Sequence, residues 1–137
     1  MKLLGMIGGM SWENTIDYYK GINEIVIRKK GTWNSAKLLL YSVNFNEILP
    51  LQEEGKWDEL AKIMVNISKN LQKAGADAIF ICSNTMHKVA DEIEDNITIP
   101  LIHVIDATAK VIRKNNIKNI GLLGTRFTME GEFYVKR

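Results

Sequence analysis

The chain has 137 residues, enough for one well-buried core, and its 46% hydrophobic and 25% charged residues are ordinary for a globular protein. A formal net charge of +2, with lysines spread over predicted helix faces, indicates neither a nucleic-acid partner nor a membrane partner. The single cysteine excludes an internal disulfide, and no secretory segment or long apolar span is present, so the cytoplasm is the expected location.

The first predicted strand, Lys2–Ile7, ends in a glycine pair. In the segment Gly8–Ser11 the two glycines permit a sharp turn and a close approach to a ligand, and Ser11 is placed to cap the helix predicted over Ile16–Lys29. Free amides at such a helix start favour an anion beside Met10 and Ser11. The glycine spacing fits neither the GxGxxG dinucleotide pattern nor a P-loop, which leaves a loop suited to a carboxylate or a phosphate.

Strands and helices are predicted to alternate along the rest of the chain. This alternation predicts the α/β class, with a doubly wound, mainly parallel sheet and flanking helices. The further predicted strands are Ala36–Val43, Ala76–Cys82, Pro100–Val104 and Lys118–Leu123, and the further predicted helices are Trp57–Ala74, Met86–Glu94 and Ile105–Asn115. The segment Asn44–Gly55, which contains Pro50, is expected to form a loop.

The third predicted strand ends in an abrupt change from apolar to small polar residues, Ser83-Asn84-Thr85. In open α/β sheets ligands bind outside the carboxyl ends of the strands, so this corner is a candidate site. The alternative is an ordinary helix cap, because Asn and Thr are common cap residues. Since side chains alternate along a strand, we expect Cys82 to pack into the core and Ser83 to face the cleft.

Three sequence motifs, well separated along the chain, resemble those of one known protein family. They are Gly-Met-Ile-Gly-Gly-Met-Ser-Trp-Glu-Asn-Thr at 5–15, Cys-Ser-Asn-Thr-Met-His-Lys-Val-Ala-Asp at 82–91 and Leu-Leu-Gly-Thr-Arg-Phe-Thr-Met-Glu at 122–130. Together they resemble the aspartate/glutamate racemase family along the whole chain. The resemblance implies a racemase-like α/β domain over residues 1–108 and the incomplete start of a second over 109–137. Family members are longer, and their Gly-Cys-Thr-Glu motif has no counterpart in this sequence.

The resemblance implies racemisation of a small acidic amino acid, aspartate or glutamate, by removal and return of its α-proton. No cofactor is implied, and pyridoxal phosphate in particular is not. Many family members use two cysteines as acid and base, the first standing immediately before Asn-Thr. Ser83 occupies that position here and is the expected catalytic residue. A hydroxyl without an activating base is a poor proton acceptor, so we expect impaired activity in this shortened chain.

Several polar residues are expected to bind the substrate. Asn84 and Thr85 would bind a carboxylate, with helix capping as the alternative or additional role, and Met10 and Ser11 have the same double interpretation. The family shapes its distal carboxylate pocket with the loop that holds Gln52, although an exposed loop glutamine is equally expected. Thr125 and Arg126 form a third polar corner. Arg126 is the best cation for an acidic substrate, with a structural pairing to Glu130 as the alternative.

Histidine and cysteine spacing predicts no metal site, because one Cys and two His occur without an HxxxH or CxxC pattern. Two functions of different classes remain: a racemase-like isomerase, and a non-catalytic carboxylate-binding or assembly remnant of one. A flavodoxin-like signalling domain is disfavoured, since no acidic cluster ends the first strand. Apolar residues between Ala109 and Leu123 lack a predicted cover within the chain, so we expect a homo-oligomer that buries them.

Overall fold

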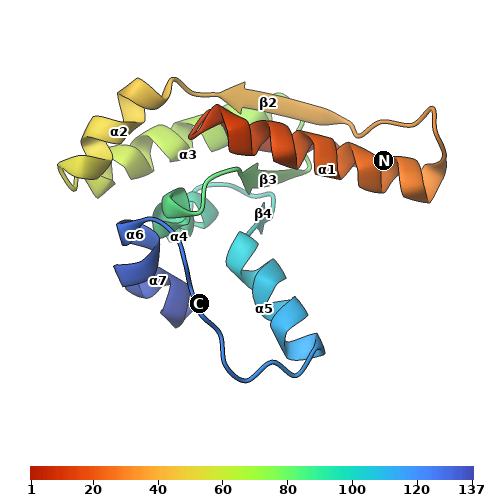
Figure 1. The fold of residues 1–137 in the computed structure, drawn as a ribbon. Helices are drawn as coiled ribbons and strands as arrows, with labels where there is room; N and C mark the ends of the chain where they lie inside the picture. Colours follow the sequence, from red (N-terminus) through yellow and green to blue (C-terminus); the bar gives the residue numbers. More distant parts are fainter.

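A computed structural model describes residues 1–137 and shows a parallel sheet between layers of helices (Figure 1). The sheet has four strands in the order β2-β1-β3-β4, and each neighbouring pair runs parallel. This confirms the predicted α/β class. The strands are β1 (Leu4–Gly8), β2 (Leu38–Ser42), β3 (Ala78–Ile81) and β4 (Leu101–Ile102), each shorter than predicted.

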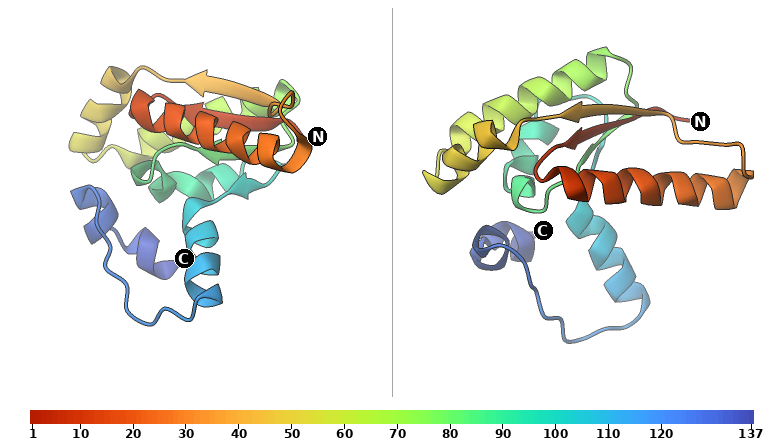
Figure 2. Two further views of the ribbon diagram at one scale, coloured as in Figure 1. Left: turned by 45° about the vertical axis from the view of Figure 1, so that its right-hand side comes forward. Right: turned by 45° about the horizontal axis from the view of Figure 1, so that its top comes forward.

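Helices cover both faces of the sheet, as a doubly wound fold requires (Figure 2). The predicted helix 86–94 is divided into a 3-10 turn followed by a short α-helix. The elements are α1 (Trp12–Lys30), α2 (Phe45–Glu53), α3 (Trp57–Lys73), η1 (Thr85–Val89), α4 (Ala90–Glu94), α5 (Val104–Lys114), α6 (Arg126–Glu130) and α7 (Glu132–Lys136). None of these helices is both long enough and apolar enough to cross a membrane.

Alternation along β3 divides the core between the two faces. Ile79 and Ile81 belong to the larger cluster, which packs with α3, whereas Phe80 and Cys82 point toward α1. Tyr18 of α1 packs edge-on against Phe80, with ring centroids 4.7 Å apart. A strand buried on both faces needs a continuous apolar run, which explains the sequence that precedes the polar corner.

The glycine pair after β1 allows α1 to lie close to the sheet. A Cβ on Gly8 would lie 2.5 Å from the methyl carbon of Thr15, closer than packed atoms allow. Gly9 has a φ of 89°, in the left-handed region, and its N–H donates to the Thr15 hydroxyl at 2.9 Å. The loop is therefore fixed by contact with the first turns of α1.

The predicted loop 44–55 is wrong, because most of it forms α2. The side-chain oxygen of Asn44 accepts the N–H of Asn46 at 3.2 Å and caps the helix, while Ile48 is fully buried. Pro50 lies inside the helix and cannot donate to the carbonyl of Asn46. Both residues are exposed, so water can serve that carbonyl, and the proline is tolerated.

The predicted strand Lys118–Leu123 is also wrong, since the segment between α5 and α6 has no regular structure. The helix α5 leads away from the sheet, and the following segment crosses from its far end to the side of α6 and α7 before it returns to the sheet (Figures 1 and 2). A strand needs a neighbour to satisfy its backbone, and no strand of the sheet lies beside this segment. Its apolar residues remain in solvent, with Ile120 61% and Leu123 91% exposed.

Candidate functional site

A cavity of about 430 Å³ opens where β1 and β3 end, and we call it the site cavity. These two strands are neighbours in the sheet, and their following helices lie on opposite faces, so they form the switch point at which α/β proteins bind ligands. The structure brings every residue proposed from the sequence into the wall of the site cavity: Met10, Ser11, Gln52, Ser83, Asn84, Thr85, Thr125 and Arg126.

Ser83 follows the end of β3, is 8% exposed, and lines the site cavity. Its hydroxyl hydrogen-bonds no other side chain. The residues that line the site cavity include neither a carboxylate nor a histidine, so the cavity wall offers no general base to the Ser83 hydroxyl.

Cys82 points to the other side of β3, as the strand alternation predicts. Its side chain is 1% exposed and packs with Met6 and Phe80. Burial raises the pKa of the Cys82 thiol to about 12. Near neutral pH this cysteine is therefore a protonated thiol outside the site cavity, and it does not replace the missing base.

Two side chains at the site cavity occupy cap positions without acting as caps. Ser11 precedes α1 and Asn84 precedes η1, yet neither side chain accepts a hydrogen bond from its helix. At the first loop, Thr15 makes the corresponding contacts, accepting from Gly9 N–H and donating to the Ser11 carbonyl at 3.3 Å. Ser11 and Asn84 therefore keep their polar groups free for a ligand.

Three threonine hydroxyls join the β3 corner to the C-terminal segment. The hydroxyl oxygens of Thr85 and Thr125 are 3.0 Å apart, and those of Thr125 and Thr128 are 3.2 Å apart. Thr85 and Thr128 complete the group at 3.5 Å. Sequence reasoning missed Thr128, although the Thr-x-x-Thr spacing from a cap residue to the first helical turn was a usable signal.

Gln52 lies on α2 rather than on an exposed loop. It is 5% exposed, and its amide donates to the sulfur of Met86 at 3.0 Å. Phe45 and Leu49 of the same helix also line the site cavity. Their spacing from Gln52 is that of one helical face, but the interpretation of this segment as a loop concealed it.

Arg126 is the only charged residue in the wall of the site cavity. It is exposed, forms no ion pair with Glu130, and lies with its guanidinium carbon 5.4 Å from the centre of the Phe127 ring. The structural pairing considered for it is therefore absent. One unpaired cation among neutral donors favours an anionic ligand.

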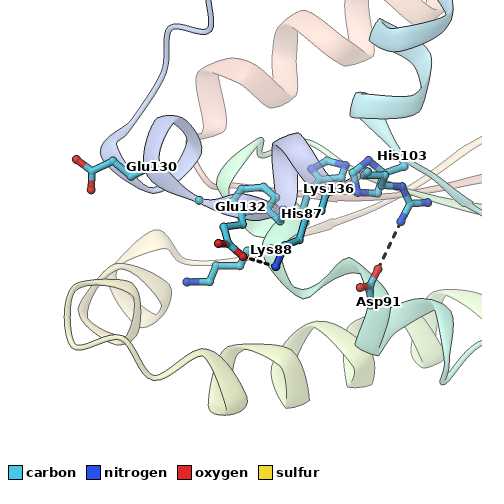
Figure 3. Close-up of a pocket in the computed structure, with 10 residues that line it drawn as sticks. His87, Lys88, Asp91, His103, Glu130, Glu132 and Lys136 are labelled. Atoms are coloured by element: carbon cyan, nitrogen blue, oxygen red, sulfur yellow. Dashed lines mark ion pairs between the residues drawn. The ribbon is translucent and has the colours of Figure 1, made fainter.

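Behind the site cavity, His87 fixes the backbone of Ser83. The His87 ring donates from Nδ1 to the Ser83 carbonyl at 2.8 Å, and its Nε2 accepts the N–H of Val104 at 3.3 Å. Its ring packs edge-on against His103 at 4.4 Å, as Figure 3 illustrates. Burial and the neighbouring His103 lower the pKa of His87 to about 4, so the imidazole is neutral and both nitrogens keep these roles.

Besides the threonine hydroxyls, one arginine and one aromatic contact hold the C-terminal helices in place. Arg137 pairs with Glu94 at 2.9 Å, with Asp106 at 3.0 Å and with Asp91 at 3.5 Å, the last drawn as a dashed line in Figure 3. Phe127 packs edge-on against Trp57 with ring centroids 5.5 Å apart. These contacts position Thr125, Arg126 and Thr128 over the β3 corner. No group of three or more His, Cys, Asp or Glu side chains lies close enough to hold a metal ion.

The sequence matches the Asp/Glu/Hydantoin racemase family over residues 7–137. The chain belongs to this racemase family. Its fold is close to that of a proposed Asp/Glu racemase from Yersinia pestis, with a TM-score of 0.93 and 54% identity over 98% of this chain. An aspartate racemase homologue from Pyrococcus horikoshii OT3 gives a TM-score of 0.87 with 38% identity over 99% of this chain.

A curated relative is the broad specificity amino-acid racemase RacX of Bacillus subtilis (strain 168), which is 25% identical over 98% of this chain. The chain spans 59% of the length of that relative, and 58% and 59% of the two solved structures. These relatives are therefore considerably longer than the chain described here.

Proposed function

We propose that this chain forms the carboxylate-binding half of a cofactor-independent racemase site for aspartate or glutamate. The observation that carries the proposal is the site cavity, in which Arg126 is the only charge among neutral hydrogen-bonding groups. A second carboxylate distinguishes acidic from other amino acids, and a lone guanidinium is well suited to bind it.

The remaining side chains suit the α-carboxylate and the substrate body. Ser11, Asn84 and Thr85 carry donors at the two strand ends, and Thr125 adds a hydroxyl from the C-terminal segment. Such donors would also stabilise the negative charge that develops when the α-proton leaves. Met10, in the loop after β1, and Gln52, on α2, also line the site cavity and would limit the length of the substrate side chain.

Ser83 is the proposed proton-transfer group on this face of the substrate. Racemisation requires a base on one face and an acid on the other, and the site cavity supplies one hydroxyl without a base. We therefore expect the chain to bind acidic amino acids but to exchange their α-protons very slowly. The same lack of a base favours the alternative function, a non-catalytic carboxylate-binding module.

Deuterium incorporation at the α-carbon separates the two functions. L-aspartate and L-glutamate are incubated with the 137-residue chain in D₂O, and exchange is followed by NMR. Slow exchange above the buffer rate that is lost in Ser83→Ala supports the racemase. Binding with exchange equal to the buffer rate supports the carboxylate-binding module.

Calorimetry tests the acidic substrate class directly. Arg126→Gln should weaken aspartate binding about tenfold, because it removes a charge-assisted contact. Arg113→Gln is a matched control, since Arg113 is exposed on α5 and does not line the site cavity. Unchanged aspartate affinity in Arg126→Gln would contradict the assignment.

Self-association and a location in the cytoplasm remain further parts of this proposal.

A further inference from the structure

A second cavity, of about 330 Å³, adjoins the site cavity at the start of α1. It is lined by Asn14, Asp17, Tyr18, Cys82 and Asn84. Asn14 and Asn84 also line the site cavity, so these two carboxamides stand between the two spaces. A ligand in contact with either carboxamide can therefore extend in both directions.

The two cavities carry opposite charges. Asp17 is the only charged residue in the wall of the second cavity, as Arg126 is in that of the site cavity. An α-amino acid has the same arrangement on a small scale, with an ammonium group one carbon away from a carboxylate. The pair of cavities is electrostatically complementary to a zwitterion rather than to a simple dicarboxylate.

The polar groups of the second cavity are free to bind. The side chains of Asn14, Asp17 and Asn84 take part in no hydrogen bond or ion pair within the chain. Asn14, Asp17 and Tyr18 are spaced three and four residues apart on α1, which places them on one face of the helix. Their oxygens, with that of Asn84, offer acceptors to the three N–H groups of an ammonium.

Tyr18 holds its place in this cavity through packing. Its ring contacts Phe80 edge-on at 4.7 Å, which fixes its direction. Burial and the neighbouring Cys82 raise the pKa of the Tyr18 hydroxyl, so the phenol stays neutral and its oxygen remains an acceptor.

We propose that Asp17 binds the α-ammonium group of an amino acid whose carboxylates occupy the site cavity, with Asn14 and Asn84 between the two ends. This inference rests on the proposed function and assigns its amino-group specificity to one residue. Asp17 is a specificity-determining residue rather than a proton-transfer group, because it lies beside the second cavity and not beside Ser83.

Succinate provides the critical comparison, because it is aspartate without the amino group. Binding of L-aspartate and of succinate to the full chain is measured by calorimetry at neutral pH for the wild type, Asp17→Asn and Glu13→Gln. Glu13 is the matched control, an exposed carboxylate in the first turn of the same helix that lines neither cavity. Asp17→Asn should weaken aspartate binding about tenfold and leave succinate binding equal or stronger. Glu13→Gln should change neither the aspartate affinity nor the succinate affinity.

The outcomes separate this inference from the function on which it rests. Unchanged aspartate affinity in Asp17→Asn overturns the ammonium site, and so does a wild type that binds succinate but not aspartate. Both results leave carboxylate binding intact. A wild type that binds neither ligand overturns the carboxylate site and the ammonium site together. Asp17 is exposed and unpaired, so the variant should keep the wild-type melting temperature, and Asp17→Glu should retain part of the preference for aspartate.

Discussion

His87 makes the stability of the fold depend on pH through two hydrogen bonds. The neutral ring donates to the Ser83 carbonyl and accepts from Val104 N–H, and a protonated ring can only donate. The pKa is about 4 in the folded chain against an ordinary 6.5, so the unfolded chain binds the proton first as the pH falls. The free energy of unfolding is therefore unaffected by His87 above pH 6.5, and it falls by roughly 3 kcal/mol as the pH is lowered from 6.5 to 4.

Urea unfolding between pH 5 and pH 7 measures this effect above the range in which most carboxylates titrate. The slope of stability against pH should be smaller in His87→Gln than in the wild type. His103→Gln is the control for the neighbouring ring, whose pKa burial also lowers. An unchanged slope in His87→Gln would show that another group carries the proton uptake.

Within single elements, the C-terminal helices depend on a residue outside the site cavity. Arg137 joins α7 to α4 and α5 through Glu94 and Asp106. Removing it should loosen α6 and α7, and with them Thr125 and Arg126. We expect Arg137→Gln to cost roughly 1–2 kcal/mol of stability and to weaken aspartate binding.

Hydrogen exchange across residues 125–137, together with calorimetry, checks this prediction. Lys136→Gln is the control, since it also removes a cation from α7 but breaks only an exposed pair with Glu132. Equal effects of the two variants would mean that the Arg137 contacts do not position the segment.

The prediction of elements from sequence succeeded where burial sets the pattern. The apolar run before Ser83 and the glycine pair after β1 are each dictated by packing against neighbours, and packing leaves a periodic signal. Five of the eight proposed site residues converge because they follow the neighbouring parallel strands β1 and β3, whereas Gln52 comes from α2 and Thr125 and Arg126 from the C-terminal segment. The roles of all eight remain predictions. The segment 44–55 was predicted as a loop because it contains Pro50, but a proline facing solvent is compatible with a helix. Residues 118–123 were predicted as a strand from their apolar pattern, but an apolar run cannot form a strand without a neighbouring strand.

For the whole molecule, an exposed apolar surface predicts self-association. Val111, Ile117, Ile120, Leu122 and Leu123 are between 39% and 91% exposed. Burying each such side chain against a partner is worth roughly 1.5–3 kcal/mol before association costs. We expect a homodimer or higher oligomer that covers residues 109–123, with the equilibrium shifted toward monomer by Leu123→Ser.

Sedimentation velocity across a range of concentrations tests this expectation. Trp33→Ser is the control, because Trp33 is 98% exposed and lies between α1 and β2, outside that segment. A monomer at high micromolar concentration, with rapid amide exchange across 119–123, would contradict the prediction.

The hydroxyls of Thr85, Thr125 and Thr128 have a consequence for how ligand binding would act on the C-terminal segment. Each hydroxyl can donate one bond and accept others, so three of them can close a ring in which every proton is used. Such a ring can run in either sense, and rotation of one hydroxyl toward a carboxylate opens it while the remaining contacts persist. A ligand that contacts this ring would therefore bind two segments forty residues apart in sequence. Its binding free energy would stabilise the packing of the C-terminal segment against the β3 corner.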